Sequence, residues 1–155
     1  MPLALTIATD DPRRADVLAL LGEHLSDMYA TSPAESVHAL DPDALAVPGI
    51  DFWTCRDDGE LLGCVALKEL DAAHAELKSM RTATAARRRG VAAALLDHVV
   101  GEARRRGVTR ISLETGTQDY FLPARTLYGS RGFRECPPFG DYRLDPSSVF
   151  LTLAL

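Results

Sequence analysis

The fold is decided by residues 82–96, which read Thr-Ala-Thr-Ala-Ala-Arg-Arg-Arg-Gly-Val-Ala-Ala-Ala-Leu-Leu. Residues 76–82 alternate apolar and polar side chains before this stretch, which is typical of a strand, and an amphipathic helix follows it. The first backbone N–H groups of a helix have no partner within it, and the helix dipole adds partial positive charge there. Gly90 and Ala92 leave room for an anion to approach this backbone, and more positive charge comes from Arg87, Arg88 and Arg89.

The pattern Arg87-x-x-Gly90-x-Ala92, between a strand and a helix, resembles the acyl-CoA pyrophosphate loop of the GNAT N-acetyltransferase superfamily. The later segment Leu127-Tyr128-Gly129-Ser130-Arg131-Gly132-Phe133 is similar to the last-helix segment of that superfamily. The resemblance covers most of the chain, is strongest over residues 75–133 and is weak before Phe52. Residues 32–40 and 113–116 resemble those of a bacterial subgroup whose substrate is unassigned.

Hydrophobic periodicity predicts a single mixed α/β domain, residues 1–155, with the element order β-α-α-β-β-β-α-β-α-β-β. We expect the first helix to begin at Asp10-Asp11-Pro12, and the second to run from Ser32 to about Asp41-Pro42. The third is expected over about 88–106 and the fourth over 123–130. Strands are expected at 3–8, 50–56, 60–70, 75–82, 109–114, 133–136 and 149–155. The resemblance implies the GNAT fold, a mixed sheet of about seven strands whose fourth and fifth strands splay apart around the thioester arm of the cofactor.

The composition excludes several classes of protein. A formal net charge of -5 argues against binding nucleic acid by bulk attraction, although basic residues cluster locally at 87–89 and 104–106. Such local clusters on an acidic chain suit a small polyanion such as CoA. The three cysteines (Cys55, Cys64 and Cys136) have no metal-site spacing, so no metal is expected. No segment approaches the roughly 20 apolar residues of a membrane span, and we expect a cytoplasmic protein.

The resemblance implies acetyl-CoA as co-substrate and assigns its binding residues. Backbone N–H groups at the start of the third helix would meet the pyrophosphate, and the end of the preceding strand would pair with the pantetheine. The corresponding positions are Met80, Arg81, Thr82, Arg87, Arg88, Arg89, Gly90, Val91, Ala92 and Ala93.

Acetyl transfer to an amine needs a base, because an alkyl ammonium has a pKa of about 10.4. Counted back from Arg87, Glu76 falls where histone-acetylating members of the superfamily place their general base. A plain ion pair of Glu76 with Lys68 or Lys78 is the alternative. His74 and Glu114 are lesser candidates.

The departing thiolate needs an acid. Many members of the superfamily have a tyrosine at the position of Tyr128 that protonates the sulfur, whereas the alternative is a buried aromatic whose hydroxyl is already engaged. One departure from the family pattern lies nearby. Many members carry an asparagine three residues before the position of Ala124, and here that residue is Phe121.

The resemblance implies that the first two helices and the loop before the last strand form the wall of the acceptor pocket. The candidates for substrate contact are Tyr29, His38, Tyr142 and Arg143. Aromatic side chains with an arginine and the nearby Asp141 suit a small zwitterion such as an amino acid.

We therefore expect an N-acetyltransferase that moves the acetyl group of acetyl-CoA directly to a primary amine of a small molecule. The alternatives are acetylation of a protein amine, and a non-catalytic acyl-CoA-binding or regulatory domain on the same fold. A nucleic-acid module that uses the two arginine triplets is disfavoured by the net charge. Many members of the superfamily form homodimers, but this sequence does not fix an interface.

Overall fold

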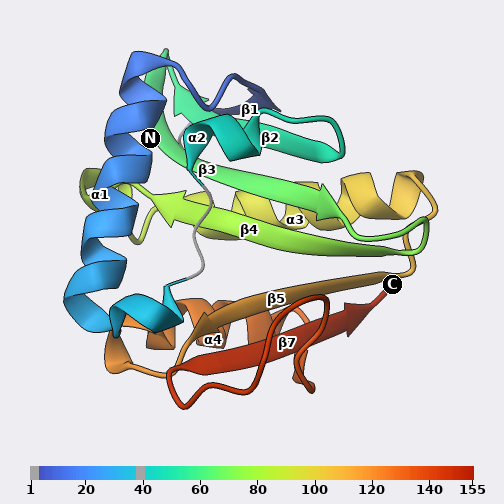
Figure 1. Cartoon of the computed structure of the whole chain (residues 1–155). Coiled ribbons are helices and arrows are strands. Elements are labelled where there is room, and N and C mark those ends of the chain that lie inside the picture. The colour runs from blue at the N-terminus through green and yellow to red at the C-terminus, as the bar shows by residue number, and fades with distance from the viewer. Residues whose placement is uncertain (1–3, 38–40) are drawn as a thin grey trace.

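The computed structural model describes residues 4–37 and 41–155 and contains a seven-stranded mixed sheet in the order β1-β2-β3-β4-β5-β7-β6 (Figure 1). The strands are β1 (Leu5–Thr9), β2 (Ile50–Asp57), β3 (Glu60–Glu69), β4 (His74–Thr82), β5 (Arg110–Gly116), β6 (Arg134–Glu135) and β7 (Ser148–Ala154). The helices are α1 (Ala15–Thr31), α2 (Pro42–Leu45), α3 (Val91–Arg105) and α4 (Leu122–Ser130). Three short 3₁₀ turns are η1 (Ala34–Ser36), η2 (Thr84–Ala86) and η3 (Asp119–Phe121). Apart from these turns, the predicted element order is confirmed.

The centre of the sheet opens between β4 and β5. These two strands are parallel and pair only where His74, Ala75 and Glu76 face Arg110, Ile111 and Ser112. Beyond Glu76 the ladder stops, and the strands diverge (Figure 1). A bulge in β4 accompanies the divergence: Ser79 has a φ of 55°, and the pairing with β3 shifts between Lys78 and Arg81. Bulges bend a strand and increase its twist, so this one turns β4 away from β5.

Helices cover both faces of the sheet. α3 and α4 lie behind it in Figure 1, where Leu95, Leu96 and Tyr128 join the larger apolar cluster. α1 and α2 cover the other face with a smaller cluster that includes Val17 and Leu45. Gly63 of β3 permits the close approach of α3, because a Cβ there would lie 2.8 Å from Arg81 O and 2.9 Å from Val91 Cγ1.

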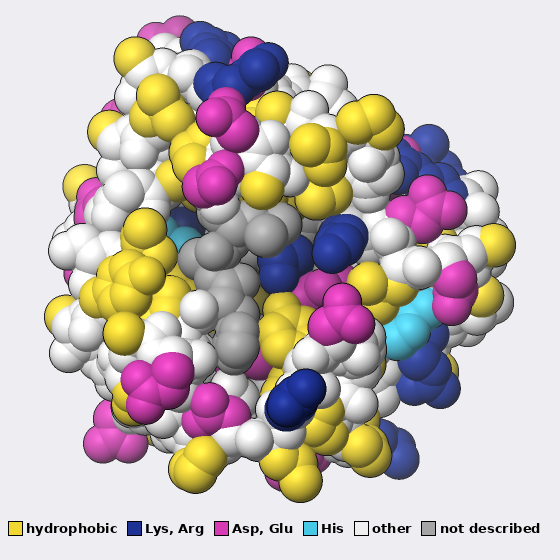
Figure 2. Space-filling model, viewed as in Figure 1, with side chains coloured by type: hydrophobic (Ala, Val, Ile, Leu, Met, Phe, Trp, Pro, Cys, Tyr) yellow, Lys and Arg dark blue, Asp and Glu magenta, His cyan; other side chains and the backbone are white. Residues whose placement is uncertain are grey.

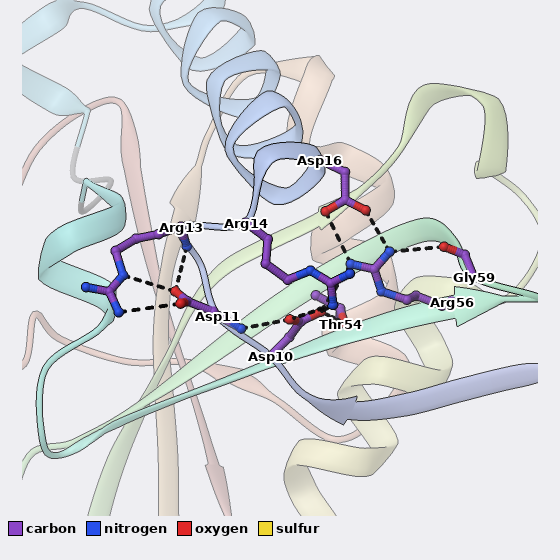
Figure 3. A network of polar contacts seen from close by, with 8 residues as sticks. All are labelled: Asp10, Asp11, Arg13, Arg14, Asp16, Thr54, Arg56 and Gly59. Atoms are coloured by element: carbon purple, nitrogen blue, oxygen red, sulfur yellow. Dashed lines mark hydrogen bonds and ion pairs between the residues drawn. The ribbon is translucent and has the colours of Figure 1, made fainter.

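The predicted start of the first helix at Asp10-Asp11-Pro12 is wrong, since α1 begins at Ala15. The Asp10 carboxylate accepts hydrogen bonds from the Thr54 hydroxyl (2.7 Å) and from Arg56 (3.1 Å), both on β2. Asp11 accepts from the backbone and side chain of Arg13. Figure 3 shows these contacts as one network. The acidic side chains are therefore engaged by arginines and a strand hydroxyl and do not cap a helix.

The predicted second helix, from Ser32 to Asp41-Pro42, is also wrong. Residues 38–40 lie outside the described part of the chain; between Ser32 and Val37 the described residues form only the 3₁₀ turn η1, and the Asp-Pro pair begins α2 where it was expected to end a helix. Asp41 Oδ1 accepts a 2.8 Å hydrogen bond from the Ala44 N–H, and Pro42 occupies the first helical position. Both features favour helix starts.

Helix α3 begins at Val91, three residues later than expected. Arg88 and Gly90 have φ values of 64° and 79°, which are incompatible with a right-handed helix. The arginines of the loop therefore precede the helix.

Candidate active site

Two connected hollows occupy the opening between β4 and β5. We call the first the inner cavity; it is bordered by Glu76 and Lys78 of β4, Glu114 of β5, and Tyr142 of the segment between β6 and β7. The second, the outer cleft, runs along the arginine loop to the start of α3. Both hollows are bordered by His24, Met80, Phe121, Ala124 and Tyr128. In Figure 2 the surface is hollowed over β4 and toward β5, and basic and acidic side chains reach this hollow side by side.

The outer cleft brings together nearly all the predicted cofactor residues. Its border includes Met80, Arg81, Thr82, Arg87, Arg88, Gly90, Val91, Ala92 and Ala93, whereas Arg89 lies outside it. Gly90 precedes α3, and its carbonyl accepts from the Ala94 N–H at 3.0 Å. The N–H groups of Val91, Ala92 and Ala93 therefore have no partner earlier in the helix. No aspartate or glutamate among the described residues borders this cleft, so its chemistry suits an anion.

Arg81 is the buried centre of a network that the sequence did not reveal. Its side chain is only 4% exposed, and its guanidinium binds Glu23 and Asp27 of α1. It also donates a 2.7 Å hydrogen bond to the Tyr120 hydroxyl, which itself donates to Asp27 at 2.9 Å. Arg87 lies 5.9 Å from the centre of the Tyr120 ring. The side chain of Arg81 thus joins β4, α1 and η3 beside the outer cleft.

Tyr128 lies where the two hollows meet. It is a residue of α4, is 5% exposed, and packs against Phe133 with ring centres 5.7 Å apart. Burial raises the pKa of Tyr128, so the phenol stays protonated at neutral pH. No side chain among the described residues hydrogen-bonds to its hydroxyl.

Glu76 belongs to a buried polar cluster in the inner cavity. Its Oε2 accepts from the Tyr142 hydroxyl at 2.6 Å and from Lys78 Nζ at 3.1 Å. Lys78 also donates to the Tyr142 hydroxyl at 2.9 Å. The ion pair with Lys78 that the sequence offered as an alternative is therefore present, and Glu76 also borders the cavity.

Two further titratable residues border the inner cavity. Burial raises the pKa of Glu114 to about 7. The negative charges of Glu76 and Asp145 raise this pKa as well, whereas the positive charge of Lys78 lowers it. His24, on α1, also borders this cavity. It was not predicted as a site residue, because a lone histidine on a helix usually has a packing role. His74, the other lesser candidate, hydrogen-bonds to Ser112 at 2.7 Å and is not among the residues that border the cavity.

The predicted acceptor residues are only partly brought together. Tyr142 borders the inner cavity, whereas Tyr29 and Arg143 are exposed and do not. His38 lies outside the described residues. Phe121, which departs from the family pattern, packs so closely on Gly116 that a Cβ at residue 116 would lie 2.2 Å from the Phe121 ring.

Other kinds of site find little support in the described part of the chain. It holds no group of three or more His, Cys, Asp or Glu side chains that could bind a metal ion. None of its helices is both long enough and apolar enough to cross a bilayer. Cys55, Cys64 and Cys136 are all free thiols.

Comparison with known proteins places this geometry in a family. The family model for the acetyltransferase (GNAT) family matches residues 17–133. The uncharacterized N-acetyltransferase YsnE of Bacillus subtilis is 50% identical over 149 residues, which cover 96% of this chain and 99% of YsnE. An IAA acetyltransferase of Azospirillum brasilense is 36% identical, with 95% of each chain covered.

A solved structure shares the fold. A GNAT family acetyltransferase from Elizabethkingia anophelis, with acetyl-CoA bound, aligns over 97% of this chain and 98% of its own with a TM-score of 0.71. Its sequence identity is 18%, so the likeness is one of fold. The family match, which spans the arginine loop, Glu76 and Tyr128, shows that the chain belongs to the GNAT family of acetyltransferases.

Proposed function

We propose that this acetyltransferase moves the acetyl group of acetyl-CoA directly to a primary amine of a small molecule. The observation that carries the proposal is the meeting of the two hollows at Tyr128: one is lined by arginines and helix N–H groups, the other by carboxylates. A donor and an acceptor bound in the two hollows would meet at that point, so no acyl-enzyme is needed.

The outer cleft fits CoA. Arg87, Arg88 and the first N–H groups of α3 suit the diphosphate, because guanidinium groups and helix starts both bind phosphate. Apolar residues continue the cleft toward Tyr128, namely Pro123, Ala124 and Leu127, and they suit the pantetheine arm. The Elizabethkingia neighbour, which binds acetyl-CoA on the same fold, supports this assignment.

The inner cavity favours a cation at its reacting end. Its described border carries two carboxyl groups, Glu76 and Glu114, against the single ammonium of Lys78, and Glu114 is about half ionised at pH 7. An alkylammonium acceptor would therefore be attracted and would find a proton acceptor beside it. We assign Glu76 as that acceptor. Glu114 is a second candidate, since a base works best with a pKa near the operating pH.

The transfer proceeds through a tetrahedral intermediate. The amine loses a proton to a carboxylate, and its nitrogen bonds to the thioester carbon. When the tetrahedral intermediate collapses, the C–S bond breaks and the sulfur takes both electrons. Tyr128 donates its proton to that sulfur and regains one from the former amine nitrogen, which sheds its second proton as it becomes an amide; the amide and free CoA then leave.

The walls of the inner cavity favour a small acceptor over a protein amine. Ser36 of η1 donates a 2.7 Å hydrogen bond to Asp145, which joins the α1 side of the cavity to the segment before β7. Ser32 and Gln118 make a second contact, at 3.4 Å. These contacts narrow the access for a folded chain.

The test is amine-dependent release of CoA from acetyl-CoA, measured with a panel of amino acids and other primary amines. We expect Glu76→Gln and Tyr128→Phe each to lower kcat by about 10² to 10⁴-fold, the usual range for general acid–base catalysis. Glu69→Gln, at the exposed end of β3, is the matched control and keeps the wild-type rate.

Two results would contradict the proposal. A wild-type chain that binds acetyl-CoA in calorimetry but never releases CoA would be a binding or regulatory domain. A chain that binds no acetyl-CoA would remove the proposal altogether.

A further inference from the structure

His24 is one of the five residues that border both the inner cavity and the outer cleft. The others are Met80, Phe121, Ala124 and Tyr128, so His24 and Tyr128 are the two that carry N–H or O–H donors on their side chains. If acyl donor and acceptor meet where the hollows meet, these two side chains border the reacting atoms. Of these two side chains, only Tyr128 has a role in the proposed transfer.

The two side chains reach this place from opposite sides of the sheet. α1, which carries His24, packs through Val17, Leu20 and Leu21 on one face. Tyr128 of α4 belongs to the apolar cluster on the other face. A planar thioester held between β4 and β5 would therefore have one polar side chain on each side.

The His24 ring is neutral and has no hydrogen-bond partner among the described residues. Burial lowers the pKa of His24 to about 4. The positive charge of Arg81 lowers this pKa further, whereas the negative charge of Asp27 raises it. A neutral imidazole has one N–H donor and one acceptor nitrogen. None of the described residues hydrogen-bonds to this ring, which is half-buried and borders both hollows, so a bound molecule can reach its N–H.

We infer that His24 donates a hydrogen bond to the carbonyl oxygen of the bound thioester, an inference that rests on the proposed function. As the amine nitrogen bonds to the carbonyl carbon, one C–O electron pair moves to the oxygen, which becomes negative. The imidazole N–H stabilises that charge and keeps its proton. When the C–S bond breaks, the pair returns to the carbonyl, and Tyr128 protonates the sulfur. A donor that stays neutral can serve an oxyanion without transferring a proton, a role that neutral histidine fills in other enzymes.

The kinetic test compares His24→Phe with His24→Gln, whose amide restores a donor. We expect His24→Phe to lower kcat by about 10²-fold, the usual effect of removing one oxyanion donor, with the KM for acetyl-CoA within about twofold of wild type. His24→Gln should recover part of the lost rate. His98→Phe on α3 is the matched control, because His98 packs edge-on against Trp53 and borders neither hollow. An effect confined to the KM of the amine would place His24 on the acceptor and overturn the inference.

A spectroscopic test separates this inference from the function itself. Acetyl-CoA labelled with ¹³C at the carbonyl is bound to each variant, and its C=O stretch is recorded by infrared difference spectroscopy. We expect the band at lower wavenumber in wild type and His24→Gln than in His24→Phe. Equal bands in wild type and His24→Phe, with acetyl-CoA bound, overturn the role of His24 alone. Failure of the wild type to bind acetyl-CoA overturns the proposed function and this inference together.

Discussion

The Tyr142 hydroxyl donates a 2.6 Å hydrogen bond to Glu76 Oε2 and so joins the segment between β6 and β7 to the central strand β4. Lys78 donates to both partners, at 2.9 Å and 3.1 Å. Burial raises the pKa of Tyr142, and the adjacent charge of Glu76 raises it further. The phenol therefore remains a donor throughout the neutral range, and the carboxylate keeps two donors beside the inner cavity.

Tyr142→Phe tests how far this cluster supports the site. The ring would keep its packing on Phe139 (5.1 Å between centres) and Phe150 (5.6 Å), while the buried carboxylate and ammonium lose a shared partner. We expect the free energy of unfolding to fall by about 1–3 kcal/mol, the cost of leaving buried polar groups under-satisfied. Urea unfolding measures this value. Wild-type stability together with wild-type kcat would show that the hydroxyl has no role.

Gly116→Ala tests the contact with Phe121. A Cβ at this position would lie 2.2 Å from Phe121 Cδ2, so the ring that borders both hollows must move. We expect a loss of about 1–3 kcal/mol, typical of overpacking, and a lower affinity for acetyl-CoA.

The second change Phe121→Leu should recover part of the stability lost in Gly116→Ala, which a double-mutant cycle would detect. Gly101→Ala in α3 is the control, because a Cβ there meets nothing within 4 Å. It should be neutral or stabilising by up to about 1 kcal/mol. If Gly116→Ala behaves like Gly101→Ala, the two residues are not coupled.

Glu114→Gln should change how stability depends on pH. The pKa of Glu114 is about 7 in the folded chain, against an ordinary value of 4.5, so the folded state holds this proton more tightly than the unfolded state. The wild type therefore loses stability as pH rises from about 4.5 to 7. The variant, which has no proton to lose, should gain on the wild type over that window by up to about 3 kcal/mol.

The measurement is urea unfolding of both proteins at pH 4, 6 and 8. Glu69→Gln is the control and should follow the wild type at every pH, since Glu69 is exposed. A difference between Glu114→Gln and the wild type that stays constant from pH 4 to pH 8 would exclude a raised pKa.

Structural features that depend on residues close together in the sequence could be predicted. The order of strands and helices follows from local periodicity, and the arginine loop is a local signal at the junction of β4 and α3. The loop residues Arg87, Arg88 and Gly90 border one cleft. What local reasoning could not place was the start of α1, because Asp10 is engaged by Arg56, 46 residues later.

The acceptor side of the site depends on contacts between distant segments. Arg81 binds Glu23 across 58 positions, and Tyr142 meets Glu76 across 66. No spacing rule connects such pairs, so His24 and the Phe121–Gly116 contact were invisible in the sequence. Tyr29 has the aromatic character expected of an acceptor residue, but its place on α1 leaves it 54% exposed and outside the cavity.

Asp10→Asn tests the network that fixes the start of α1 to β2 (Figure 3). Although burial alone would raise the pKa of Asp10, hydrogen bonds from Thr54, the Asp11 N–H, Arg56 and Arg14 lower it to about 2. The ordinary value is 3.8, so the stabilisation from this carboxylate is complete above about pH 4 and is lost as pH falls toward 2. We expect Asp10→Asn to cost about 2 kcal/mol at pH 7, with a difference from wild type that shrinks below pH 4. The control is Asp11→Asn, which removes a solvent-exposed pair with Arg13 and should cost much less than Asp10→Asn. Equal losses for the two variants in urea unfolding at pH 7 would mean that the Asp10 network contributes no more than a surface ion pair.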